Sequence, residues 1–220
     1  MATAAVNPNV LEFEFNEQEH LYVVKATKRP AISVTQVLAS VGFVSYEFVK
    51  QEVLEYKSSL GTAVHKATEI LDEDPDALNW DTVAPEAVPY VLAWEKFKKE
   101  MKFVPKRIEY RNCVRVNGVP VGFQIDREGL LEGFPAIAEI KCTCAEEKSW
   151  RYQLGGYDAC MRAAGLKPEG MPYWTRFGVR LTPEAKYKIC GPYNSPHHID
   201  VFRCSLVVAQ EKINEKIGGE

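Results

Sequence analysis

The sequence predicts an α/β fold in which helices flank a central mixed β-sheet. Helix-type segments come first, β-type segments fill the middle of the chain, and a helix, further strand-like pieces and a last helix follow. Helices and strands interleaved in this way are typical of one mixed core. The chain has 220 residues, 46% of them hydrophobic, with no internal repeat and no linker that would divide it. We therefore expect a single domain over residues 1–220.

The N-terminal part predicts a hairpin followed by a helix at about residues 10–50. Residues 11–25 alternate in part between apolar and polar side chains, which favours two strands that turn at Asn16–Glu19. Ser33 precedes a periodic apolar run. A serine in that place is a helix-start signal, because its hydroxyl accepts hydrogen bonds from the free backbone N–H groups.

Two more helices are expected before the strands. Gly61 is expected to open a helix, rich in good helix formers, that runs to about residue 73. Residues 72–86 are acidic and interrupted by prolines, which indicates a loop or a short lid. Residues 88–102 carry apolar side chains among charges at helical spacing, which predicts the third helix.

The pattern then changes to β-type segments. Strands are expected at 107–116, 121–131 and 134–141, joined by a hairpin turn at Asn117-Gly118 and a four-residue turn at 132–135. A helix over 149–166, ended by Gly165 and Pro168, follows them. The remaining expectations are strand-like pieces at 176–181, 186–193 and 198–206 and a closing helix at 208–219.

Charge and cysteine content exclude several classes of protein. A formal net charge of -3 argues against a protein that coats nucleic acid without specificity, although a carboxylate-rich enzyme is compatible with it. No apolar stretch reaches the length of a membrane span and no basic segment precedes an apolar run at the N-terminus, so we expect a cytoplasmic protein without a membrane partner. Only Cys142 and Cys144 lie close together, so neither zinc nor an iron–sulfur cluster is expected.

Asp126, Glu139 and Lys141 form the constellation that points to chemistry. A four-residue turn at 132–135 would place Asp126 opposite Lys141, with Glu139 as its diagonal neighbour at ~7–8 Å on the same sheet face. An ordinary surface salt bridge is the alternative. The apolar run 136–138 before Glu139 favours a buried strand instead, where charges need a partner or a metal.

This set of side chains suits the hydrolysis of a phosphodiester bond. Carboxylates are natural ligands of Mg²⁺ or Mn²⁺. Such an ion lowers the pKa of its bound water and stabilises the charge that develops in the transition state. A nearby lysine can orient or deprotonate the water, or neutralise the transition state.

Asp126 with Glu139-Ile140-Lys141 resembles the split acidic motif of the PD-(D/E)xK nuclease superfamily. Three further motifs are similar to those of its RecB-like exonuclease branch: Gly61 to His65, Gly122 to Asp126, and Gln153 to Tyr157. The similarity covers residues 61–157, and the segment that begins at Ser33 also resembles small free-standing viral-type members. It implies a restriction-endonuclease-like core at about residues 58–210.

The resemblance also implies roles for single residues. His65, Asp126, Glu139 and the main-chain carbonyl of Ile140 would hold Mg²⁺ or Mn²⁺. Asp126, Glu139 and Lys141 would be the catalytic residues. Gln153 and Tyr157, one helical turn apart, would support the site and contact the nucleic acid strand.

Four other residues are weaker candidates. Glu109 stands where many members of the branch keep an acidic residue on the preceding strand. Glu69 lies one helical turn beyond His65 and could orient it, or it could be a solvated helix residue. Arg151 and Tyr152 could bind backbone phosphate or stack on a base, and a plain surface position suits them equally well.

The function implied is that of a metal-dependent deoxyribonuclease, foremost an exonuclease in DNA recombination, repair or viral DNA processing. A structure-specific endonuclease on the same fold, an inactive nucleic-acid-binding module and a nonenzymatic interaction protein are the alternatives. The chain lacks the cysteine pattern of relatives with an iron–sulfur cluster, and it has no helicase phosphate-binding motif. It would therefore act on DNA alone or with a separate recombination or helicase partner, in an oligomeric state that the sequence leaves open.

Overall fold

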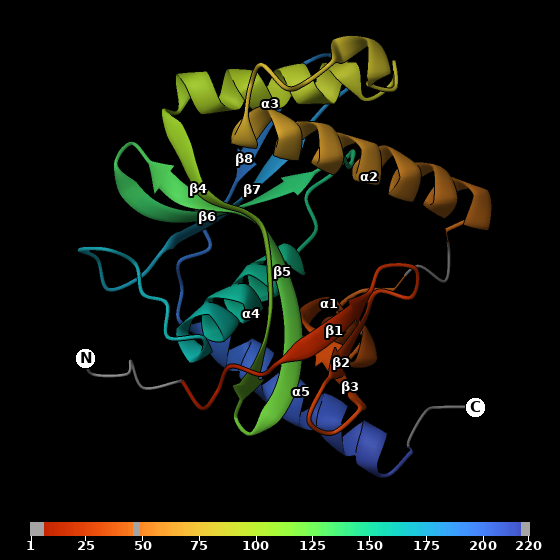
Figure 1. Ribbon diagram of the computed structural model, residues 1–220, viewed down its shortest axis with the longest axis vertical. Coiled ribbons are helices and arrows are strands. Elements are labelled where there is room, and N and C mark those ends of the chain that lie inside the picture. The colour runs from red at the N-terminus through yellow and green to blue at the C-terminus, as the bar shows by residue number, and fades with distance from the viewer. Residues whose placement is uncertain (1–6, 46–48, 217–220) are drawn as a thin grey trace.

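The computed structural model describes residues 7–45 and 49–216 and has the expected α/β architecture (Figure 1). Eight strands form one mixed sheet in the order β1-β2-β3-β5-β6-β7-β8, and β4 pairs with β5 off this path. Helices α2 and α3 lie on one side of the sheet, and α1, α4 and α5 lie on the other (Figure 1). Each side has its own apolar core, so the sheet is covered on both faces.

The N-terminal hairpin is confirmed, with β1 at Phe13–Asn16 and β2 at Leu21–Val24. The side chain of Asn16 stabilises its turn by accepting hydrogen bonds from the next backbone N–H groups. Strand β3 (Arg29–Ser33) pairs antiparallel with β2 and parallel with β5, so the hairpin is continuous with the main sheet. Helix α1 (Val34–Ser40) begins after Ser33, as the sequence predicted, and the side chain of Ser33 forms a capping box with Gln36.

Helix α2 (Gln51–Glu73) is longer than expected, because it starts at Gln51 rather than at Gly61. A side chain at Gly61 would meet no atom, so this glycine is a tolerated interior residue and not a helix start. A short 3-10 turn at Trp80–Thr82 interrupts the acidic loop that follows. Helix α3 (Val88–Glu100) matches the third predicted helix closely.

Strands β4 (Phe103–Val116), β5 (Val119–Leu131) and β6 (Phe134–Lys141) form the predicted meander. The turn between β5 and β6 is shorter than expected: Leu131 pairs with Phe134, and the turn consists of Glu132 and Gly133. Both turn residues have positive φ, +51° and +88°, as a two-residue hairpin turn requires. The predicted register is therefore wrong by two positions, but an even shift leaves every side chain on its expected face.

The C-terminal third contains α4 (Trp150–Ala163), β7 (Thr175–Leu181), β8 (Tyr187–Cys190) and α5 (His197–Asn214). The predicted strand at 198–206 is wrong, since this segment is the first half of α5. Its β-branched and aromatic residues favour a strand locally, but the buried positions Phe202, Ser205, Leu206 and Ala209 follow helical spacing. Within the described ranges, no helix is long and apolar enough to cross a membrane.

Candidate active site

Asp126 and Glu139 lie side by side where β5 and β6 separate. The last backbone pair between these strands is Arg127 with Ala138, and the same register brings Asp126 opposite Glu139 rather than opposite Lys141. Beyond that pair, Asp126 Oδ2 accepts a hydrogen bond of 2.7 Å from the backbone N–H of Ile140. A side chain thus replaces the ladder at this point, and both carboxylates are buried, with exposed fractions of 7% and 4%.

His65, Glu109 and Asp126 form a tight cluster of possible metal ligands. His65 Nδ1 lies 3.0 Å from Glu109 Oε1 and 3.6 Å from Asp126 Oδ1. One ligand atom from each of the three residues lies within 4.8 Å of the other two. The structure therefore brings the weaker sequence candidate Glu109 beside His65 and Asp126.

The backbone of Glu109 is strained. It has a φ of +44°, a region that side-chain-bearing residues rarely adopt. The strain falls in the gap of the ladder between the pairs Ile108–Arg127 and Tyr110–Ile125, so Glu109 stands across from Asp126. Non-glycine residues in this conformation cost on the order of 1–3 kcal/mol and cluster at functional sites.

Burial and mutual repulsion perturb the ionisation of this cluster. Burial, with the neighbouring charge of Glu139, raises the pKa of Asp126 to about 8. Burial lowers the pKa of His65, but the charge of Asp126 and the hydrogen bond to Glu109 outweigh it, and the pKa rises to about 9. The hydrogen bond and charge of His65, with the charge of Arg127, outweigh burial at Glu109 and lower the pKa of that carboxyl. A buried aspartate that resists ionisation, beside an imidazole that keeps its proton, is typical of a functional site.

Glu139 is held from one side only. Its Oε1 lies 3.0 Å from Lys141 Nζ and accepts a 2.8 Å hydrogen bond from Gln153 Nε2. Gln153 also accepts from Lys141 and donates to the hydroxyl of Tyr157. The other oxygen of Glu139, Oε2, is buried and has no hydrogen-bond partner among the described residues. A buried carboxylate oxygen without a partner is costly, so it calls for a cation or a donor from outside the chain.

These residues fit a divalent metal ion. The donors available are carboxylate oxygens of Glu109, Asp126 and Glu139 with the imidazole of His65, a set that favours Mg²⁺ or Mn²⁺ over a thiolate-bound metal. The contact seen at Ile140 is through its N–H group, which fixes the rotamer of Asp126. Its carbonyl remains a candidate ligand.

The sequence-based interpretation missed Arg127 and Asp72. Arg127 is fully buried, with its Nε 2.6 Å from Asp72 Oδ2 and its Nη1 2.9 Å from Glu109 Oε1. It also donates to the backbone carbonyl of Asp126 and to Thr68, so it ties the carboxylate cluster to α2. Helical spacing was the available signal for Asp72, because residues 65, 68 and 72 recur on one helix face. Strand alternation gave no such signal for Arg127, since it predicts that Arg127 and Asp126 point to opposite faces of β5.

The remaining candidates have other partners. Glu69 forms an ion pair with Lys66 at 2.9 Å, and the position beside His65 belongs to Glu109. Arg151 lies over the ring of Tyr193 at 5.8 Å. Tyr152 stacks on Phe43 with ring centroids 4.9 Å apart. The contacts of these three residues are thus with Lys66, Tyr193 and Phe43, and binding of phosphate or a base by Arg151 and Tyr152 stays a prediction.

Metal binding should depend on pH in a direction that the pKa shifts define. Asp126 must lose its proton and His65 must be neutral to act as ligands, and their pKa values lie near 8 and 9. We expect the increase in melting temperature caused by Mn²⁺ to grow between pH 6 and pH 9. Thermal denaturation with and without Mn²⁺ measures this, with Asp76→Asn in the exposed loop after α2 as the control. If the increase in melting temperature caused by Mn²⁺ became smaller as the pH rose, the assignment of Asp126 and His65 as ligands would be wrong.

Comparison with known proteins adds little. No family model matches the chain, and no curated protein matches it. One solved protein, described as SSO0001, aligns over 69% of this chain and 74% of its own, with a TM-score of 0.36 and 14% sequence identity. Two chains that differ this much share too little to transfer a fold or a function.

Proposed function

We propose that this chain is a metal-dependent nuclease that hydrolyses DNA phosphodiester bonds, as its resemblance to the RecB-like branch of the PD-(D/E)xK superfamily implies. One observation carries the proposal. Asp126 and Glu139 meet at the point where β5 and β6 separate, and the buried Glu139 has one oxygen without a partner and the other bound to Lys141. The four motifs of the resemblance contribute residues to this one place, which supports a restriction-endonuclease-like core.

When bound at this site, a divalent ion would activate water and stabilise the charge on the phosphate. The residues that would hold it are the clustered His65, Glu109 and Asp126. The unpartnered Oε2 of Glu139 and the carbonyl of Ile140 are further candidates. The N–H of Ile140 holds Asp126 in one orientation before any ligand arrives. Such preorganisation removes part of the cost of ordering the site.

In this proposal Lys141 is the catalytic lysine. Its Nζ lies between Glu139 Oε1 at 3.0 Å and Gln153 Oε1 at 3.2 Å, which fixes the ammonium beside the carboxylates. From there it can place a proton donor and a positive charge next to the phosphate oxygens. Gln153 positions both Lys141 and Glu139 through hydrogen bonds, and its own side chain is held by a hydrogen bond to the hydroxyl of Tyr157.

Digestion of end-labelled linear DNA and closed circular DNA tests the proposal. Each substrate is incubated with Mg²⁺, with Mn²⁺ and with EDTA. Metal-dependent release of nucleotides from linear DNA alone is the expected result and defines an exonuclease. Cutting of the closed circle would define the endonuclease alternative. Binding without cleavage would indicate an inactive module, and the absence of both would overturn the proposed function.

Exonuclease activity would place the chain in DNA recombination, repair or viral DNA processing. The substrate of such an enzyme is a DNA end, which another enzyme of the same process must create by cutting or unwinding. A separate recombination or helicase partner is therefore part of the proposal.

Tyr157 should contribute modestly through its hydroxyl. Tyr157→Phe keeps the buried ring and removes only the acceptor of the 2.8 Å hydrogen bond from Gln153. One hydrogen bond contributes about 0.5–1.5 kcal/mol, so we expect a fall of up to about tenfold in the single-turnover rate. Tyr173→Phe is the matched control, since Tyr173 is exposed. A loss of several hundredfold would show that the hydroxyl itself contacts the reacting group.

A further inference from the structure

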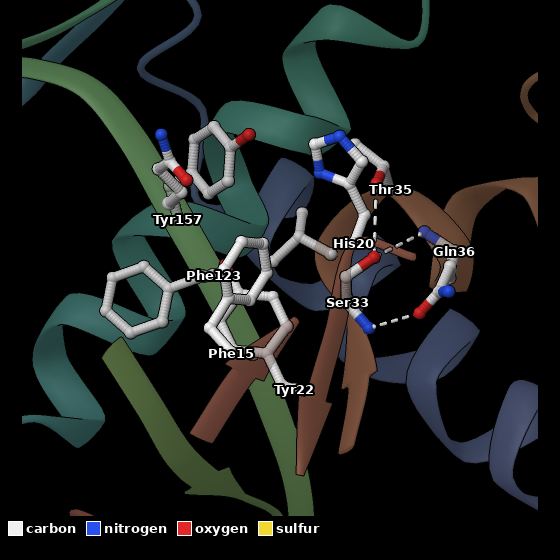
Figure 2. Close-up of a pocket in the computed structure, with 11 residues that line it drawn as sticks. Phe15, His20, Tyr22, Ser33, Thr35, Gln36, Phe123 and Tyr157 are labelled. Atoms are coloured by element: carbon white, nitrogen blue, oxygen red, sulfur yellow. Dashed lines mark hydrogen bonds between the residues drawn. The ribbon is translucent and has the colours of Figure 1, made fainter. Parts of the chain in front are cut away.

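A pocket lies beside the N-terminal hairpin, and one of its lining residues, Gln124, contacts Glu109 of the candidate active site. It has a volume of about 210 Å³, and Figure 2 shows the side chains around it. They come from the β1–β2 hairpin, the start of α1, strand β5 and helix α4. The lining residues are Phe15, His20, Tyr22, Ser33, Val34, Thr35, Gln36, Gly122, Phe123, Gln124 and Tyr157.

Aromatic rings form one wall of this pocket. The rings of Phe15 and Tyr22 lie 4.7 Å apart, and the ring of His20 lies 6.0 Å from that of Phe15. The guanidinium of Arg111 packs on Phe15 at 3.7 Å. A Cβ at Gly122 would come within 2.2 Å of the Tyr22 ring, so only glycine allows this ring to lie against β5. The aromatic wall is thus a built feature of the fold.

The chemistry of the lining selects a neutral, planar ligand. None of these lining residues, all of which the structure describes, is Lys, Arg, Asp or Glu. A phosphate group is recognised by cationic side chains, so this lining does not suit one. Hydroxyl and amide groups of Ser33, Thr35 and Gln36 lie across from the aromatic rings (Figure 2). Pockets for drug-sized ligands have about 300–1,000 Å³, so the space here matches a smaller group, such as one nucleobase.

The pocket is coupled to the candidate active site by contacts on two sides. Gln124 lines it and donates a 2.6 Å hydrogen bond to Glu109. Tyr157 lines it and accepts from Gln153, which binds Glu139. A neighbouring pocket of about 260 Å³ shares Thr35 and Gln36 with it and contains Lys141 and Gln153. A strand whose phosphate lies at Lys141 therefore has this aromatic pocket within reach of an adjacent base.

We propose that the aromatic pocket binds one unstacked nucleobase of the strand held at the carboxylates. The inference rests on the proposed nuclease function and adds a subsite to it. Phe15 and His20, which are half-buried and exposed respectively, supply the stacking surface, and the buried ring of Tyr22 packs against Phe15. The polar residues opposite contact the edge of the base. Stacking tolerates every base because each has a π-face, so the pocket positions the strand rather than reads its sequence.

Binding of single-stranded oligonucleotides tests this subsite through a double-mutant cycle. Affinity is measured by fluorescence anisotropy in Ca²⁺, with one abasic site moved along the strand. For the wild type we expect affinity to fall by about 10- to 100-fold at one position only. Phe15→Leu keeps the apolar packing and removes the aromatic face. This variant should bind the intact strand more weakly by a similar factor. Its affinity should no longer depend on whether the abasic site stands at that position.

Two further variants keep the test falsifiable. His20 has a φ of +49°, and asparagine tolerates this conformation, so His20→Asn removes a ring from the pocket while it keeps the turn. It should reproduce part of the Phe15→Leu effect. Phe134→Leu is the control, because Phe134 is exposed at the opposite end of β6 from Glu139.

Each outcome separates the subsite from the nuclease function. The subsite would be overturned if the abasic site and Phe15→Leu lowered the affinity additively. An equal loss of affinity in Phe134→Leu would overturn it too. Failure of the intact strand to bind would overturn it as well. Metal-dependent cleavage by the wild type without the coupling would leave the nuclease function standing and remove only the pocket. Coupling without cleavage would remove the catalytic function and leave a base-binding protein.

Discussion

Replacing Glu139 by glutamine should abolish DNA cleavage and leave the fold intact. Glutamine keeps the size of the side chain but removes the charge beside Asp126, Lys141 and the unpartnered Oε2 position. Loss of a metal-binding carboxylate removes several kcal/mol of transition-state stabilisation, which corresponds to a fall on the order of 10³-fold in rate. Cleavage of end-labelled DNA in Mn²⁺ measures the loss, with Glu132→Gln in the exposed β5–β6 turn as the matched control.

The same variant should be more stable than the wild type without metal. The charge of Glu139 contributes to the raised pKa of Asp126, so the two carboxylates destabilise each other when both are ionised. Removing one of them should raise the melting temperature in EDTA and weaken the stabilisation that Mn²⁺ gives. A Glu139→Gln protein that cleaves DNA at nearly the wild-type rate would show that the ligand assignment is wrong.

Lys141→Ala should lower the rate of the chemical step by about 10²–10³-fold while DNA affinity changes little. An interaction that forms mainly in the transition state appears in the turnover rate rather than in ground-state binding. Single-turnover cleavage at saturating DNA gives the rate, and binding in Ca²⁺ gives the affinity. Lys188→Ala on the exposed part of β8 is the control for general loss of positive charge.

The two measurements on Lys141→Ala distinguish two roles for the ammonium. A normal saturated rate with much weaker binding would make Lys141 a phosphate anchor. The contact with Glu139 adds a second readout, because loss of Lys141 leaves Gln153 as the hydrogen-bond donor to the Glu139 carboxylate among the described residues. The increase in melting temperature that Mn²⁺ causes is then compared between Lys141→Ala and the wild type. A difference would show that Lys141 also affects metal binding by Glu139.

Most secondary structure could be predicted because local signals coincided with tertiary ones. The serine that caps α1 and the apolar, β-type residues of β5 and β6 are strong local patterns, and these elements formed as predicted. The predicted register of β5 and β6 was wrong because the same residues can form a two-residue or a four-residue turn. The choice depends on whether Glu132 can adopt a positive φ. The strand predicted at 198–206 failed for a different reason: its helical spacing shows only over a longer window that includes Ala209.

The candidate site was predictable where residues alternate along a strand and unpredictable where contacts join distant elements. The common face of Asp126 and Glu139 follows from alternation alone and survives the register error. The contact of Glu109 with His65 joins β4 to α2. It requires a positive φ at Glu109, which no local sequence pattern predicts. The ion pair between Arg127 and Asp72 likewise joins β5 to α2 through the interior.

The left-handed backbone at Glu109 has a consequence for engineering. A design method that optimises stability would place glycine or asparagine there, because either residue relaxes the φ of +44°. Either choice would also remove the carboxylate that accepts from Gln124 and meets His65 and Arg127. Substitution at position 109 should therefore raise thermal stability and lower the proposed activity, so variant libraries designed for stability should keep Glu109.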